Sequence, residues 1–128
     1  MALEVGLRGR AALRVAADHT AERLGSGDLP VLGTPALAAL FEAAAVNALA
    51  GHLAPGETTV GTRIEVSHSA PTPVGAEVYA EAELVAVEGR KLRFAATAFD
   101  HREQIGECRH ERAIVARDRF LGRLKDKS

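Results

Sequence analysis

The stretch TPALAALFEAAAVNALAG, residues 34–51, carries the strongest structural signal in the sequence. Thr34 is a residue type that caps helix N-termini, and Pro35 is tolerated at the first helical position, where no backbone donor is needed. Between Pro35 and the helix-stopping Gly51, Glu42 is the only charged residue and Asn47 the only other polar one. The stretch therefore predicts a helix that ends at about Ala50, is buried on most sides and is too short to span a bilayer.

Alternating residues on both sides of this helix predict β-strands. Apolar and polar side chains alternate over residues 5–18, 58–68, 76–86, 91–99 and, more weakly, 105–115. In the second of these segments the expected helix-facing residues are Val60, Thr62, Ile64, Val66 and His68.

The remaining segments read as connections. Residues 19–32 predict a loop with one short helical turn, residues 69–75 a proline-rich bend, and Glu88-Gly89 a tight hairpin turn. Residues 117–128 predict a solvated or frayed charged tail.

The order of these elements predicts the architecture. One strand, a long buried helix and four strands with short connections favour an antiparallel meander that one helix covers. The 128 residues amount to one domain. The expected fold is α+β of the hotdog type, a curved five-stranded antiparallel sheet wrapped around one long buried helix.

The composition argues against several classes of partner and cofactor. Sixteen Lys and Arg against 17 Asp and Glu argue against a nucleic-acid partner. With one cysteine, Cys108, and no leader-like segment, a cytoplasmic protein without a membrane partner is expected. The five histidines show no metal-ligand spacing and no glycine-rich phosphate loop is present, so no metal or cofactor is expected.

Glu42 and His68 are the candidate acid/base residues. Burying a carboxylate without a partner costs several kcal/mol, so Glu42 lies either on an exposed stripe or in a polar pocket. Its alanine-rich surroundings favour the pocket. His68 is either a satisfied core or interface histidine or, with Glu42, half of a general acid/base pair. Cys108 has no histidine and acid partner and is expected to be structural.

Three segments resemble the hotdog thioesterase family that includes the fluoroacetyl-CoA thioesterases. They are VLGTPALAALFEAAAVNAL at 31–49, TTVGTRIEVSHSAPTPVG at 58–75 and IGECRHERAIV at 105–115. The resemblance implies that Thr34, Glu42 and His68 form the catalytic set, and that acyl-CoA binds at the subunit interface of a homodimer. In fluoroacetate-specific members the loop before the threonine carries aromatic residues, whereas residues 19–32 contain none.

The sequence therefore predicts an acyl-CoA thioesterase for small acyl groups. His68 would be the general base, Glu42 would activate water or attack the carbonyl, and Thr34 would contact the thioester near the helix N-terminus, whose N–H groups suit an oxyanion. The candidate substrate-binding residues are Gly33, Gly61 and Arg63.

Two other functions and one geometric question stay open at this point. The alternatives are a non-catalytic protein that binds acyl-CoA or another small ligand, and a hydratase of enoyl-CoA. Eight residues of helix span about 12 Å, so Thr34 and Glu42 of one chain cannot touch along a straight helix. Either the capping loop folds back or two subunits share the site.

Overall fold

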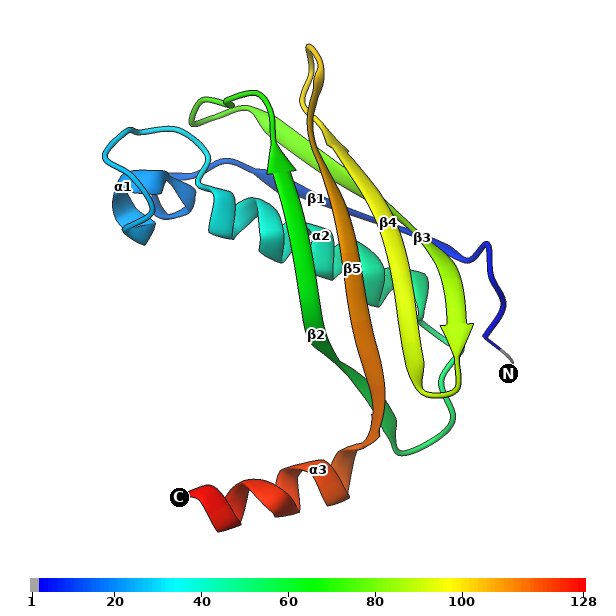
Figure 1. Ribbon diagram of the computed structural model, residues 1–128. Helices are drawn as coiled ribbons and strands as arrows, with labels where there is room; N and C mark the ends of the chain where they lie inside the picture. Colours follow the sequence, from blue (N-terminus) through cyan, green and yellow to red (C-terminus); the bar gives the residue numbers. More distant parts are fainter. Residues whose placement is uncertain (1–2) are drawn as a thin grey trace.

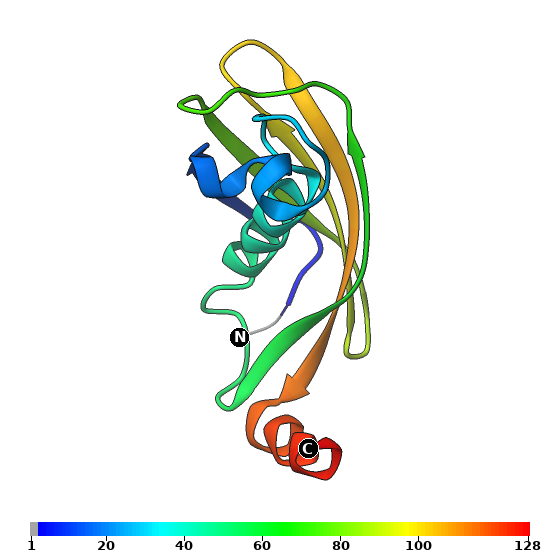
Figure 2. The same cartoon turned by 90° about the vertical axis from the view of Figure 1, so that its left-hand side faces the viewer.

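The computed structural model describes residues 3–128 and shows a curved five-stranded sheet around one long helix (Figure 1). Viewed from the side, the long helix α2 lies in the hollow of the curved sheet (Figure 2). The expected hotdog fold is confirmed. Its elements are β1 (Arg8–Arg14), η1 (Ala17–His19), α1 (Ala21–Leu24), α2 (Thr34–Ala48), β2 (Glu57–His68), β3 (Glu77–Glu88), β4 (Lys91–Phe99), β5 (Gln104–Ala116), α3 (Arg117–Leu124) and η2 (Lys125–Lys127).

The strand order is β1-β3-β4-β5-β2, and all neighbours are antiparallel. The meander expected after the helix holds only for β3, β4 and β5, because β2 pairs with β5 and not with β3. The proline-rich segment 69–75 instead carries the chain from one edge of the sheet toward the other. β1 and β2 are the edge strands.

The first strand is shorter than predicted at both ends. Gly6 has φ of 105°, a turn conformation that precedes β1, and the 3₁₀ turn η1 begins at Ala17. The short helical turn expected in residues 19–32 is confirmed as α1.

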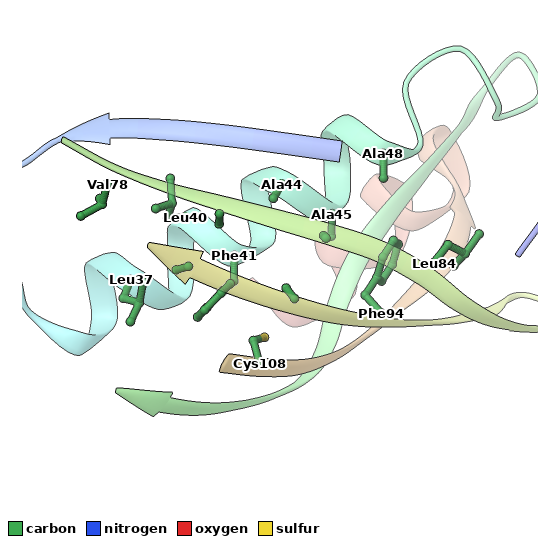
Figure 3. Close-up of a cluster of buried hydrophobic side chains, with 14 of the residues drawn as sticks. Leu37, Leu40, Phe41, Ala44, Ala45, Ala48, Val78, Leu84, Phe94 and Cys108 are labelled. Atoms are coloured by element: carbon green, nitrogen blue, oxygen red, sulfur yellow. The ribbon is translucent and has the colours of Figure 1, made fainter. Parts of the chain in front are cut away.

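The helix α2 packs one side on the sheet. Figure 3 shows Leu37, Leu40 and Phe41, followed by three alanines, directed at Val78, Leu84 and Phe94 of the strands. The prediction that α2 is buried on most sides is wrong, because Ala39, Ala43 and Asn47 are exposed and Val46 is 46% exposed. An alanine-rich helix has too little contrast between its sides for sequence to identify the exposed one.

A β-bulge in β2 changes which residues face the helix. The register with β5 shifts between Gly61 and Arg63, so one residue is inserted. Thr59 and Gly61, and not Val60 and Thr62, therefore share the helix side with Ile64, Val66 and His68. The Thr59 hydroxyl accepts a hydrogen bond from the buried Arg112, and a Cβ at Gly61 would meet the carboxylate of Glu42.

The C-terminal segment is solvated, one of the two predicted alternatives, but it forms a helix and not a frayed tail. Phe120, Leu121 and Leu124 lie along one side of α3, a helical spacing within a charged segment. The N–H of Arg117 donates to the carbonyl of Gly56 at 2.9 Å, which ties the start of α3 to the start of β2. No residue of α3 is buried, and the helix stands away from the rest of the chain (Figure 2).

None of the helices described for residues 3–128 has the length and apolar character that a membrane crossing requires.

Gly9 should be the most sensitive glycine of the sheet. A Cβ there would overlap the backbone of Ala44 and Ala48 in α2. We expect Gly9→Ala to destabilise the fold by about 1–3 kcal/mol, because neither backbone can move away without repacking the core. Denaturant unfolding measures the change. Gly122→Ala is the control, since nothing lies within 4 Å of that position, and equal losses for both variants would contradict the proposed contact.

Candidate functional site

The first polar cluster joins the start of α2 to the end of β2. Thr34 is the first helical residue and Gly33 the N-cap, so the expectation that Thr34 caps the helix is wrong. Its hydroxyl is instead 2.8 Å from Nδ1 of His68. Ala36 and Leu37 donate their N–H groups to Gly33, and Pro35 has none. Among residues 3–128 the N–H of Thr34 is thus the free donor of the first turn.

His68 has one ring nitrogen without a partner. Burial lowers the pKa of His68, and a backbone hydrogen bond involving Ala70 opposes this to a smaller extent. The imidazole is therefore neutral at pH 7. Its Nε2 is buried and makes no hydrogen bond within residues 3–128. A buried nitrogen of this kind is costly unless another group meets it.

The second polar cluster is centred on Glu42, in the middle of α2. A guanidinium nitrogen of Arg112 lies 3.0 Å from Oε2 of Glu42, and Nε2 of His110 lies 3.7 Å from the same oxygen. The Arg112 side chain is 8% exposed and that of Glu42 42%. Glu42 is thus half-buried and paired, and the expectation of a polar environment fits better than that of a solvated stripe.

Four hydrogen bonds hold Arg112 in place. Besides Glu42, it donates to the hydroxyl of Thr59 at 2.9 Å, to the carbonyl of Thr59 at 3.2 Å and to His110 at 3.1 Å. His110 Nδ1 lies 2.7 Å from the carbonyl of Arg63 and donates to it. Burial, followed by the charge of Arg112, lowers the pKa of His110 against the opposing effects of the Arg63 hydrogen bond and of Glu42 and Glu111. A neutral His110 can therefore accept from Arg112.

Sequence reasoning missed Arg112 and His110. Both side chains are buried on the side of β5 that faces the helix, and Cys108 lies on the same side. Polar residues on that side made the alternation of 105–115 weak. The available signal was a charged residue, Arg112, at a position that the alternation assigns to the buried side of the strand. A buried guanidinium requires a carboxylate as its partner.

The other candidates occupy different environments. Gly61 lies against the Glu42 carboxylate, where no larger side chain would fit. Gly33 is buried against Ala21 and Leu24, so its small size serves packing. The Arg63 side chain pairs with Glu65 at 2.8 Å, both largely exposed. Burial, with a smaller effect of Glu42, raises the pKa of Cys108 to about 12, which fits the structural role expected of it.

The two clusters have no direct contact in the single chain. Thr34 and His68 lie at one end of α2, and Glu42 lies two turns further along. A pocket of about 570 Å³ lies on the outer face of the sheet, and none of these residues lines it. The single chain therefore holds two separate polar clusters.

A buried hydrogen-bond network fixes Thr34 and His68 relative to each other. Thr72, which is fully buried, donates its hydroxyl to Asp100 at 3.0 Å, and its carbonyl accepts the N–H of Leu32 at 2.9 Å. Leu32 precedes the Gly33-Thr34 pair, and Thr72 follows His68 in the next loop. The network thus joins the two loops from which Thr34 and His68 are held.

Known proteins match this chain over most of its length. A family model described as fluoroacetyl-CoA-specific thioesterase matches residues 15–118. A fluoroacetyl-CoA thioesterase of Streptantibioticus cattleyicolor is 41% identical over 98 residues, 77% of this chain and 70% of the relative. A solved structure of the fluoroacetyl-CoA thioesterase FlK has a TM-score of 0.92 at 35% identity, over 100% of this chain and 99% of that one. A hot-dog-like protein from Thermanaerovibrio acidaminovorans has a TM-score of 0.88 at 25% identity, over 98% and 93%.

Asp100 should stabilise the fold in a pH-dependent way. Burial acts to raise the pKa of Asp100, but hydrogen bonds from the N–H groups of Arg102 and Glu103 and from Thr72 outweigh it, and the pKa lies below its usual value. The stabilisation is therefore present above pH 3.8 and is lost as the pH falls through the lower pKa of the folded state.

We expect Asp100→Ala to lower the free energy of unfolding by about 1–3 kcal/mol at pH 7. Below pH 3.8 the difference in unfolding free energy between the variant and the parent should become smaller. Denaturant unfolding at several pH values measures both. Asp126→Ala, at an exposed position, is the control. A gap that stays constant with pH would contradict this role.

Proposed function

This chain belongs to the family of fluoroacetyl-CoA-specific thioesterases and hydrolyses acyl-CoA thioesters, and from this premise we propose that two copies of it assemble each active site. The observation that carries the proposal is the separation of the Thr34–His68 and Glu42–Arg112 pairs within one chain. A second copy can supply the half that each chain lacks at that place.

The free edge of the sheet supports a homodimer. β2 is an edge strand of 12 residues, and such an edge offers unpaired N–H and C=O groups to another strand. The uncovered alanines of α2 and the half-exposed Val46 add apolar surface that a partner can bury. Antiparallel pairing of two β2 strands satisfies both edges at once.

Such pairing would also bring the two half-sites together. In an antiparallel pair, the end of one strand lies beside the first half of the other. His68 ends β2, whereas Gly61, which covers Glu42, lies in its first half. His68 would then approach the partner's Glu42.

In this arrangement each group has a chemical role. With Nδ1 of His68 held by Thr34, the neutral imidazole takes a proton from a water molecule. Both contacts to Glu42 fall on Oε2, so Oε1 is left to orient that water. The water oxygen bonds to the thioester carbonyl carbon while Thr34 O–H and N–H donate to the developing oxyanion. The C–S bond then breaks, and His68 returns its proton to the CoA thiolate.

We expect Glu42→Gln and His68→Ala each to lower kcat by about 100-fold to 10,000-fold, the usual contribution of an acid–base group. Release of free thiol from acetyl-CoA measures the rate. Both variants should remain dimers at twice the 13.5 kDa chain mass, which light scattering checks. Near-normal activity of either variant would contradict the assigned roles.

Mixing the two inactive variants tests the shared site. A mixed dimer has one complete site and one site that lacks both groups, so unfolding and refolding the pair together should restore about a quarter of the parent activity. Each variant refolded alone is the control. No recovery, with mixed dimers demonstrably formed, would place Glu42 and His68 of one chain in the same site.

The acyl group should be short but weakly selected. The described loop 19–32 has no aromatic side chain to close over a two-carbon acyl group, and each added methylene changes binding by about 1–3 kcal/mol. We expect hydrolysis of acetyl, propionyl and butyryl thioesters, with kcat/KM values of neighbouring chain lengths within about 200-fold of each other. A preference for fluoroacetyl over acetyl above about a thousandfold would contradict this proposal.

A further inference from the structure

An arginine-lined hollow lies between α3 and the end of β5. Its volume is about 230 Å³, and its walls combine three arginines with the apolar end of the strand. The lining residues are Arg90, Ile114, Val115, Ala116, Arg119, Phe120 and Arg123. No carboxylate is among them, so the charge of the hollow is positive.

Two of these arginines are available to a ligand. Arg119 and Arg123 are four residues apart on one side of α3, and neither forms an ion pair or side-chain hydrogen bond within residues 3–128. Arg90 differs, because it lies 3.5 Å from Glu57 and donates to the carbonyl of Ile114 at 3.4 Å. Paired guanidinium groups on one helix face match the oxygens of a phosphate group.

The position of the hollow relates it to the proposed active site. α3 runs from the end of β5 toward the side of β2, the edge proposed to meet the partner (Figure 1). In an antiparallel β2 pair this end of one chain lies next to the end of β2 that carries the partner's His68. Within one chain, four residues of β5 separate Arg112 from Ala116, a path of about 13 Å. An extended pantetheine arm can cover such a path.

We propose that Arg119 and Arg123 bind the phosphate groups at the nucleotide end of CoA while its thioester occupies the shared site. This inference rests on the proposed function, because it needs a dimer with the thioester near Glu42. The family model ends at residue 118, so it does not include Arg119 and Arg123.

Comparing two substrates tests the subsite. Acetyl-CoA carries the phosphates, and acetyl-pantetheine presents the same thioester without them. In Arg119→Ala/Arg123→Ala we expect KM for acetyl-CoA to rise about tenfold with kcat unchanged, as charge-assisted contacts at a screened surface are lost. Both kinetic constants for acetyl-pantetheine should equal those of the parent. Alanine favours helix, so α3 itself is retained.

The matched control is Arg102→Ala/Arg109→Ala, which removes the same charge from two exposed arginines outside the hollow. It should leave KM for acetyl-CoA unchanged. The subsite is overturned if KM is unaffected by loss of Arg119 and Arg123, if the control raises KM equally, or if acetyl-pantetheine turnover falls in parallel. A parent protein that hydrolyses neither thioester would instead refute the thioesterase function itself.

Discussion

The close approach of the sheet to α2 is the constraint on which the rest of the structure depends. Gly9 of β1 has no space for a Cβ against the backbone of Ala44 and Ala48, and β3 presents the buried alanines Ala80 and Ala82. With so little side-chain volume between them, helix and sheet lie close, and the sheet curves around the helix. Glu42 is consequently carried to where a side chain of β5 can reach it.

Burial of Arg112 is the main electrostatic cost of this arrangement. Removing a guanidinium from water costs several kcal/mol, and only full satisfaction of its donors offsets this. Glu42, Thr59 and a neutral His110 accept four hydrogen bonds from its five N–H donors. Because both nearby contacts fall on Oε2, the network fixes the Glu42 carboxylate and leaves Oε1 free. The same contacts that stabilise the arginine therefore also fix the orientation of the carboxylate.

Two kinds of sequence signal predicted the fold. The strands and the inward positions of Ile64 and His68 follow from the alternation of residues, whereas the helix around Glu42 follows from its start and stop residues and its apolar composition. Periodicity assigned Val60 to the wrong side of the sheet, because one residue inserted at the bulge exchanges the two sides for all earlier residues of the strand. It also could not show that β2 pairs with β5, since that contact joins segments about fifty residues apart.

The candidate site was partly predictable for a similar reason. Glu42 and His68 stand out as polar residues where apolar ones are expected, and Thr34 follows from the family resemblance, whereas Arg112 was hidden in a charged stretch. Its partner Glu42 lies 70 residues earlier in the chain. A pair of this kind becomes visible only when the sheet and the helix are placed together.

Three features along β2 lack a partner in the single chain. The strand edge lacks pairing, His68 has no carboxylate beside it within residues 3–128, and Oε1 of Glu42 lacks the contacts that hold Oε2. Each alone costs stability or serves no purpose within the chain. One twofold axis through paired β2 strands addresses all three, since it covers the edge and brings each histidine toward the other chain's carboxylate. In the proposed dimer each folded chain is half of a catalytic unit, and the groups that it lacks lie along the strand that the second copy would meet.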